Sequence, residues 1–329
     1  MTWLDLPPDA PFGAANLPYG VFSAGDGSPR VGVRIGEEVL DLARALGEQV
    51  FAEPALNAFM AQGRARWGDV RARITELLAD ERHRATVEAA LRPLAHLRLH
   101  LPFVPGDSRR LDFEAEVGFV IGTGSARGTP VSVAEFADHV FGVFLVNDWS
   151  ARDIQAWESA PLGPFLAKSF ATSVSPWVVP LQALEHAWVS PLRNQDPEPL
   201  PYLAGPADRG LDLALEVRLN GHLVSRPPFA TMYWTAAQML AHMTVNGASV
   251  RTGDFYASGT VSGPEPGQRG CLLELSWGGS EPLTLADGSV RSFLEDQDVV
   301  AVTATAPAAD GARIGFGEVT GQILPAVEG

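Results

Sequence analysis

The chain has 329 residues, of which 46% are hydrophobic, enough to bury one large core or two smaller ones. Its 39 acidic side chains outnumber 24 Lys and Arg, and the formal net charge of -15 argues against nucleic acid or anionic membranes as partners. A single cysteine, Cys271, excludes an intramolecular disulfide, and no apolar run approaches the roughly 20 residues of a membrane span. We therefore expect a cytoplasmic protein that acts on a small molecule.

The first part of the chain, residues 1–104, is predicted to form a small β-rich domain with helices. Apolar alternation on both sides of Gly36 predicts a hairpin of residues 30–35 and 39–42. Apolar spacing of i, i+3, i+4 predicts helical stretches at residues 55–59 and 70–79. The alanine- and arginine-rich composition continues over residues 82–97, where a further helical stretch is predicted.

The second part, residues 105–329, is dominated by short β-runs separated by glycine and proline. Residues 213–219 and 222–224 predict a hairpin, because the Asn220-Gly221 turn supplies the positive φ angles that such a connection needs. Further β-runs are residues 299–306 and 323–326. Two helices are predicted, a short one that opens on a capping box at Ser132 and an amphipathic one over residues 235–245.

Acidic side chains alternate with apolar ones between Leu111 and Phe119. A strand with this pattern places Glu114 and Glu116 on one face, which in isolation is typical of a solvated edge strand. The strand is otherwise strongly apolar, however, and a third acid, Asp148, ends the separate buried run of residues 141–146. Three converging carboxylates favour a hard divalent cation such as Mg²⁺ or Ca²⁺.

A group of polar residues follows Asp148. Arg152 and Gln155 are three positions apart, which places both on one side of a helical turn. The structural alternative pairs Arg152 with Asp153 or Glu158 on the surface.

Next, the stretch Pro161-Leu162-Gly163-Pro164 predicts a rigid loop that directs Lys168 back toward the acids. A lysine beside a metal can donate a hydrogen bond to a developing oxyanion.

These residues lie in segments that resemble the fumarylacetoacetase family, carbon–carbon hydrolases that complete tyrosine and phenylalanine catabolism. The most specific segment is DWSARDIQAWE, residues 148–158, followed by PLGPF. The resemblance also covers residues 111–122, 232–235, 257–260 and 272–277, and so nearly the whole chain after Leu111. It implies a mainly β (α+β) fold, with an N-terminal SH3-like barrel and a C-terminal mixed β-roll, and it implies a homodimer.

The resemblance also assigns site residues. It implies metal ligation by Glu114, Glu116 and Asp148, metal or site support by Lys168 and Thr172, and substrate contacts by Arg152, Gln155, Thr260 and the position of Ser159. Glu274 matches the acid that orients a catalytic histidine, although on its own it reads as an outward-facing acid between leucines in a strand. In the family's mechanism the histidine and this acid activate water to attack a diketone carbonyl, while Lys168 and Arg152 would steady the departing enolate.

The chain departs from the family pattern in two places. Ser159 stands where the family commonly has a tyrosine that contacts substrate. Residues 102–107 resemble the lead into the family's catalytic stretch, whereas residues 108–111 resemble the residues just beyond that stretch. The intervening segment carries, in the family, the fourth metal carboxylate, the catalytic histidine, and a tyrosine and an arginine that hold substrate. None of the seven histidines replaces the lost one by motif.

Two explanations for this departure are open: the protein lacks the segment, or it carries a segment that the printed sequence does not show. We favour the second, because a site without its base would leave the other site residues without a role, and an ordinary peptide bond from Asp107 to Ser108 would contradict it. The predicted function is metal-dependent hydrolysis of fumarylacetoacetate, a β-diketone acid. The alternatives are a related acylpyruvate or β-diketone hydrolase and a catalytically silent homologue.

Overall fold

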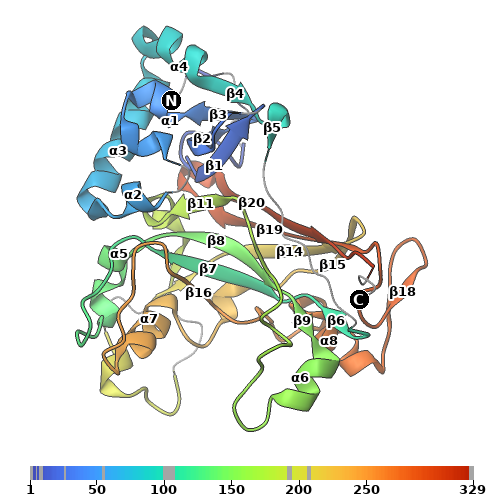
Figure 1. Ribbon diagram of the computed structural model, residues 1–329. Helices are drawn as coiled ribbons and strands as arrows, with labels where there is room; N and C mark the ends of the chain where they lie inside the picture. The colour runs from blue at the N-terminus through green and yellow to red at the C-terminus, as the bar shows by residue number, and fades with distance from the viewer. Residues whose placement is uncertain are drawn as a thin grey trace.

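The computed structural model describes residues 3–4, 6, 10–25, 27–53, 56–98, 108–190, 195–205 and 209–325. The N-terminal part, coloured blue to cyan in Figure 1, lies over a larger part that is coloured green to red. None of the described helices is long and apolar enough to cross a membrane.

An antiparallel sheet runs through both parts. In spatial order its strands are β16 (Phe255–Ala257), β7 (Ala115–Ile121), β8 (Val140–Asp148), β11 (Trp177–Pro180), β1 (Tyr19–Ala24), β2 (Arg30–Ile35), β3 (Glu38–Asp41) and β4 (Leu91–Pro93), with β10 (Thr172–Val174) paired to β8 and β5 (Leu97–Arg98) paired to β1. Strand β11 joins the two parts, because Val178 lies opposite Tyr19 of β1 and Val179 lies opposite Val143 of β8.

The N-terminal part confirms the predicted β2–β3 hairpin, while its closure into an SH3-like barrel stays a prediction. Its helices are α1 (Leu42–Leu46), α2 (Asn57–Met60), α3 (Gly63–Ala79) and α4 (Arg84–Ala90). The helix predicted through residue 97 ends at Ala90 instead, because Leu91 pairs with Leu40 of β3 and Pro93 cannot donate a helical hydrogen bond.

The core of the N-terminal part packs against side chains of β8. Trp67 of α3 meets Phe141 of β8 edge to face, with ring centroids 4.9 Å apart, and Phe59 also contacts Phe141. The two parts therefore share one hydrophobic interface.

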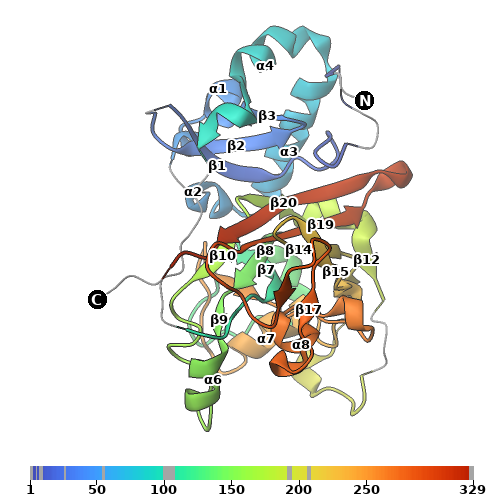
Figure 2. The ribbon, with the colours of Figure 1, turned by 90° about the vertical axis from the view of Figure 1, so that its right-hand side faces the viewer.

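The larger part adds a second antiparallel sheet and short paired strands (Figure 2). The sheet has the order β15 (His222–Ser225), β14 (Ala214–Leu219), β19 (Val299–Pro307) and β20 (Arg313–Gln322). The short pairs are β6 (Leu111–Asp112) with β9 (Ser150–Ala151), β12 (Trp188–Val189) with β13 (Gly210–Leu211), and β17 (Leu283–Thr284) with β18 (Val290–Arg291). The helices are α5 (Phe136–His139), α6 (Arg152–Glu158), α7 (Ala236–Thr244) and α8 (Leu272–Leu275).

Several local predictions for this part are confirmed. Asn220 and Gly221 both have positive φ angles, 52° and 80°, in the β14–β15 turn. Capping boxes at Ser132 and Thr235 open the predicted helices. The β-run expected at residues 323–326 is wrong, since β20 ends at Gln322 and residues 326–329 lie outside the described part.

Candidate metal and active site

Three buried or half-buried carboxylates meet where β7 and β8 lie side by side. Glu114 occupies a break between β6 and β7, Glu116 lies within β7, and Asp148 is the last residue of β8. The Asn147 side chain accepts a hydrogen bond from the Glu114 amide at 3.0 Å, which fixes this break against β8. One oxygen of each carboxylate lies within 4.8 Å of the others, so the structure brings the three predicted ligands together.

Two cations contact these acids. Lys168 Nζ lies 2.5 Å from Glu114 Oε2 and 3.3 Å from Asp148 Oδ2. Arg152, on the first turn of α6, donates from Nη1 to Glu114 Oε1 at 2.8 Å and to Gln155 Oε1 at 2.9 Å. The predicted proximity of Arg152 and Gln155 on one side of a helix is present in α6.

The alternative that Arg152 pairs on the surface is wrong. Its guanidinium is buried and its partners are Glu114 and Asp112, the latter through Nε at 2.9 Å. Asp153 instead accepts hydrogen bonds from Ser108 and from the Arg109 amide. The buried acids outcompete the neighbouring ones because an ion pair away from water is weakened less by solvent.

The negative charge at this site exceeds the positive charge. Among the described residues in contact, four carboxylates (Asp112, Glu114, Glu116 and Asp148) face two cations, Arg152 and Lys168. The formal excess of two negative charges equals the charge of one divalent cation. With oxygen donors only, the group fits a hard cation such as those the sequence predicts.

The pKa values respond to this excess. Burial, and then the charges of Glu114 and Asp148, raise the pKa of Glu116 to about 8. Burial also raises the pKa of Asp148, although Lys168 opposes the shift. For Glu114 burial acts in the same direction, but Lys168 and Arg152 outweigh it and hold the pKa below its usual value. Glu116 is therefore the carboxylate that most lacks a cation.

Sequence reasoning missed what holds Lys168 in place. The Glu158 carboxylate at the end of α6 accepts hydrogen bonds from the Phe165 amide at 2.7 Å and the Ala167 amide at 2.8 Å. These bonds fold the proline-containing loop back on α6, so that Lys168 reaches the acids as predicted. A glutamate shortly before a Pro-Gly loop was the available signal.

The structure also gives the positions of Thr172, Ser159 and Thr260 relative to the strands and helix of the site. Thr172 lies opposite Asp148 in the pairing of β10 with β8, and Ser159 follows the last residue of α6. Thr260 comes directly after Gly259, whose amide donates to Glu116 Oε2 at 3.2 Å. Gly259 has a φ of 75°, a conformation that favours glycine, and this turn presents its amide to the carboxylate.

Glu274 lies on a different element from the one predicted. It belongs to the short helix α8 and not to a strand, because the Leu272 and Leu273 amides that open the helix are held by the Asp112 carboxylate. The Glu274 carboxylate accepts a hydrogen bond from the Ser262 hydroxyl. Asp112, a buried residue that connects α8 to Arg152, is the main participant that the sequence analysis did not single out.

No histidine of the described residues joins the carboxylates, since the group that can hold an ion consists of acids alone. The His139 ring contacts the Thr123 carbonyl, and the His242 ring contacts the Tyr202 hydroxyl. Asp107 lies outside the described residues, so the predicted interruption after it stays a prediction.

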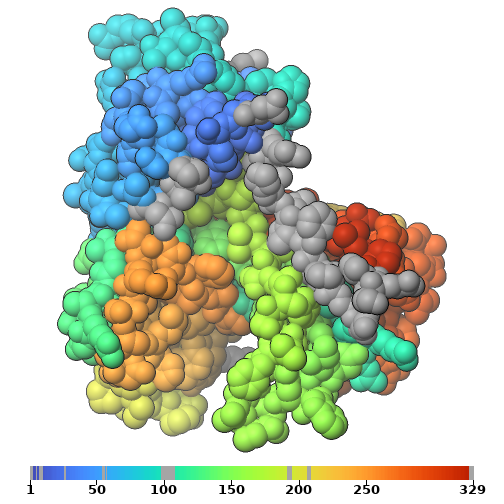
Figure 3. Space-filling view, in the orientation of Figure 1, coloured from blue at the N-terminus to red at the C-terminus, as the bar shows by residue number. Residues whose placement is uncertain are grey.

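Figure 3 shows the surface hollowed between the green segment that contains α6 and the orange segment beyond residue 240. A cavity of about 780 Å³ lies on the orange side and is lined mainly by aromatic and apolar residues, among them Tyr202, Tyr233 and Trp234. Its wall includes Ser258 and Gly259. Because the Gly259 amide contacts Glu116, this cavity borders the carboxylates.

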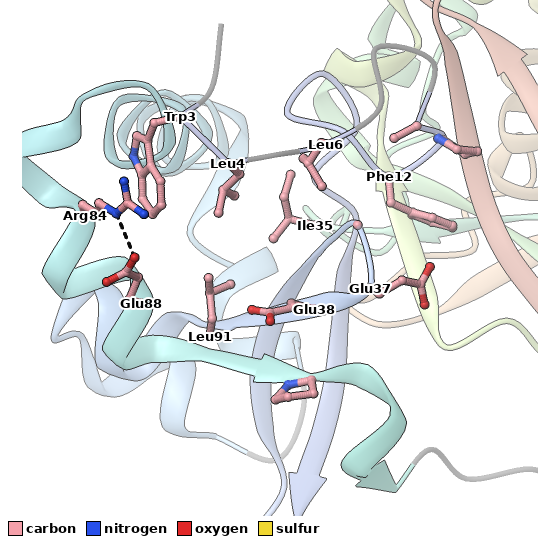
Figure 4. Close-up of a pocket in the computed structure, with 14 residues that line it drawn as sticks. Trp3, Leu4, Leu6, Phe12, Ile35, Glu37, Glu38, Arg84, Glu88 and Leu91 are labelled. Atoms are coloured by element: carbon pink, nitrogen blue, oxygen red, sulfur yellow. Dashed lines mark hydrogen bonds and ion pairs between the residues drawn. The ribbon is translucent and has the colours of Figure 1, made fainter.

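A larger cavity of about 980 Å³ lies in the N-terminal part (Figure 4). Apolar side chains such as Leu6, Ile35 and Leu91 line it, and its Arg84 and Glu88 pair with each other at 2.8 Å. Cavity size alone would therefore select the wrong region, whereas the unbalanced buried charge selects the β7–β8 end.

Solved structures share this fold. The fumarylacetoacetate hydrolase of Exiguobacterium antarcticum superposes with a TM-score of 0.57 at 17% identity, covering 94% of this chain and 99% of that one. A maleylpyruvate hydrolase of Sphingobium sp. SYK-6, solved in complex with manganese(II) and pyruvate, gives a TM-score of 0.55 at 16% identity, covering 94% and 100%.

Curated relatives are closer in sequence. The human fumarylacetoacetase is 37% identical over 418 aligned residues, and that of Arabidopsis thaliana is 36% identical over 417, with at least 98% of each chain covered. The human alignment exceeds the 329 residues of this chain by 89, so that relative carries at least 89 positions without a counterpart here.

The matches to family descriptions divide along the chain. "Fumarylacetoacetase N-terminal" matches residues 15–102, and "Fumarylacetoacetate (FAA) hydrolase C-terminal" matches residues 85–324, the range that contains every carboxylate described above. Together with identity above 30% over nearly the whole length, these matches establish that the chain belongs to the fumarylacetoacetase family.

Proposed function

We propose that this chain is a hydrolase of carbon–carbon bonds in ketonic substrates that cleaves 4-fumarylacetoacetate into fumarate and acetoacetate, the last step of tyrosine catabolism. The proposal rests on the alignment with fumarylacetoacetases, which covers nearly the full length of the chain at 37–38% identity. The carboxylate cluster supports it, because a β-diketone acid presents oxygens and negative charge to a cation and to the Lys168 and Arg152 side chains.

The proposed cation is Mg²⁺ or Ca²⁺, held by Glu114, Glu116 and Asp148 with Thr172 nearby. The donor set supports this choice, because both ions prefer carboxylate oxygens. When bound, the cation would polarise the diketone oxygens and neutralise the excess negative charge. The Sphingobium hydrolase, which has the same fold, was solved with manganese(II), and this supports a divalent cation in the proposal.

The chain's own residues would orient substrate and stabilise charge. Arg152 and Gln155, fixed to each other on α6, would bind substrate together with Ser159 and Thr260. Water adds to the carbonyl beside the fumaryl group, the adjacent carbon–carbon bond breaks, and its electron pair forms the acetoacetate enolate. Lys168 would donate a hydrogen bond to this enolate, which then takes up a proton. Glu274, held by Ser262, would orient the base that activates the water.

The test compares substrates on the purified protein with Mg²⁺ or Ca²⁺. We expect kcat/KM for fumarylacetoacetate to exceed that for simple acylpyruvates. Higher kcat/KM for an acylpyruvate would instead favour the related acylpyruvate hydrolase. Ser159 is the reason for this alternative, because it stands where the family commonly has a tyrosine that contacts substrate. A protein that binds the cation but turns over neither class would contradict both.

A second candidate is a silent homologue that binds metal and ligand without turnover. It is favoured by the 89 or more missing positions and by the all-acid composition of the described cluster. Intact mass spectrometry separates the two: a mass of 35.1 kDa supports true deletion, and a mass larger by the missing segment supports an active enzyme.

Three further features belong to this proposal: a domain boundary at residues 104–105 with an SH3-like N-terminal barrel, a cytoplasmic location, and a homodimer. Exposed apolar side chains on α6 and its loop, Trp157 at 91% and Leu162 at 80%, support an interface between copies. Sedimentation velocity at micromolar concentration tests the homodimer, and a protein that stays monomeric would contradict it.

A further inference from the structure

A fully buried aspartate accepts hydrogen bonds from two segments that are distant in sequence. Asp112 Oδ1 accepts from the Phe113 amide at 2.8 Å and the Leu272 amide at 2.7 Å. Asp112 Oδ2 accepts from the Leu273 amide at 2.9 Å and Arg152 Nε at 2.9 Å. Four donors for two oxygens satisfy the carboxylate and offset part of the cost of removing its charge from water, although burial still raises its pKa.

On one side this carboxylate sets the orientation of Arg152. A guanidinium is planar, so the bond at Nε together with those at Nη1 fixes the plane of the group. Within that plane Nη1 reaches both Glu114 and Gln155. Arg152 Nη2 is buried without a hydrogen-bond partner among the described residues, and so the position of the whole group depends on the bonds at Nε and Nη1.

On the other side the carboxylate holds the start of α8. The first amides of a helix have no partner within it, and an acid placed there accepts their hydrogen bonds and is stabilised by the helix end. Asp112 takes two consecutive amides of α8, those of Leu272 and Leu273. Glu274 follows directly on the same helix, so a shift of α8 would carry the Glu274 carboxylate away from Ser262.

We infer that Asp112 is a positioning residue that couples Arg152 to α8. It thereby keeps the Arg152 guanidinium, which would contact substrate, in a fixed position relative to Glu274. The inference rests on the proposed function, which gives these two residues their roles. Asp112 is not one of the three carboxylates that can share an ion, so its removal should affect substrate more than metal.

The chain offers a matched control in Asp298. This aspartate is 2% exposed, accepts two hydrogen bonds from Arg291, and also accepts from the Glu295 amide at 2.8 Å and from Asn220. It therefore has the same kind of partners as Asp112, but none of them belongs to the candidate site.

The experiment compares Asp112→Asn with Asp298→Asn in the full chain. Both variants should lower the midpoint of thermal unfolding. Mn²⁺ affinity, measured by electron paramagnetic resonance, should stay within threefold for both. For the Mn²⁺-loaded protein we expect Asp112→Asn to weaken acetoacetate binding at least tenfold and to raise KM for fumarylacetoacetate similarly, while Asp298→Asn changes each less than twofold.

A measurement on the wild type covers the case in which Asp112→Asn does not fold. Acetoacetate bound to the Mn²⁺-loaded protein should slow hydrogen exchange of the Leu272 and Leu273 amides at least threefold and leave that of Glu295 unchanged. The inference would be overturned if acetoacetate changed the exchange rates of all three amides by the same factor, or if the two variants had equal effects. It would also be overturned if the wild type did not bind acetoacetate. Wild-type binding of acetoacetate without hydrolysis of fumarylacetoacetate would refute the proposed function alone.

Discussion

Buried charge is handled in opposite ways in the two parts of the molecule. In the N-terminal part Asp41 is fully buried and lies 2.7 Å from Arg30 and 3.5 Å from Arg44, and it also caps α1. At the β7–β8 end, four carboxylates meet only two cations among the described residues. A buried acid that has cations of its own stabilises a fold, whereas a cluster that keeps an excess of acids needs a ligand. The ratio of acids to cations thus separates the structural cluster from the functional one.

The largest expected effect comes from removing one acid of the unbalanced cluster. Asp148→Ala should lower metal-dependent kcat/KM for fumarylacetoacetate by about 10³-fold, because a bound cation supplies several kcal/mol of charge stabilisation in such sites. Steady-state kinetics with a circular-dichroism check of folding measures this. Unchanged turnover in a folded variant would remove Asp148 from the set of ligands.

The Asp41 cluster of the N-terminal part should respond in the opposite sense. Asp41→Asn should lower the free energy of unfolding by about 3 kcal/mol, because it leaves the half-buried Arg30 without its ion partner. Urea denaturation monitors this loss, and kcat of the folded fraction should be unaffected. A large fall in kcat would show that the two clusters are coupled through β11.

Metal removal should affect stability through the unbalanced cluster alone. Saturation with Mg²⁺ at 100 times its Kd should raise the free energy of unfolding by about 2.7 kcal/mol over the chelated protein. Thermal unfolding with and without chelator tests this. Glu116→Gln should abolish the increment, Asp41→Asn should retain it, and a stabilisation that survives Glu116→Gln would place the ion elsewhere.

The pH dependence of stability arises from the same cluster of acids. Burial and neighbouring carboxylates raise the pKa of Glu116 from its ordinary 4.5 to about 8 in the folded, metal-free protein. The folded state therefore holds a proton that the unfolded state releases, and this stability, complete below pH 4.5, is lost as pH rises through about 8. Urea denaturation across this range should show the decline, and Glu116→Gln should flatten it. A wild-type profile as flat as that of the variant would contradict the shift.

Much of the site could be predicted because its residues follow simple strand patterns. Alternation in Leu111–Phe119 and the abrupt end of the apolar run at Asp148 identify two strands whose ends carry acids. Antiparallel pairing of β7 with β8 then places these acids together without further information. The proline-rich loop likewise limits where Lys168 can lie.

The remainder depended on contacts that no local pattern encodes. Glu274 lies between two leucines, as in a strand, yet a carboxylate 160 residues before Leu272 accepts hydrogen bonds from the first amides of this segment and favours a helix. The same alternation that suggested Glu114 and Glu116 included Asp112, but only the structure shows that Arg152 turns toward it. Strand β20 escaped prediction because Gly315, Gly317 and Gly321 interrupt its apolar alternation.

Strand β11 has a consequence for how the chain is made. It pairs with β1 on one edge and with β8 on the other, and Trp177 on it is almost fully buried. During synthesis the N-terminal part emerges first, but the edge of β1 at Tyr19 and Gly20 stays open until Trp177 and Val178 have left the ribosome. An open strand edge pairs readily with other chains. The N-terminal part expressed alone should therefore aggregate, because a chain truncated near residue 104 lacks the strand that closes its sheet.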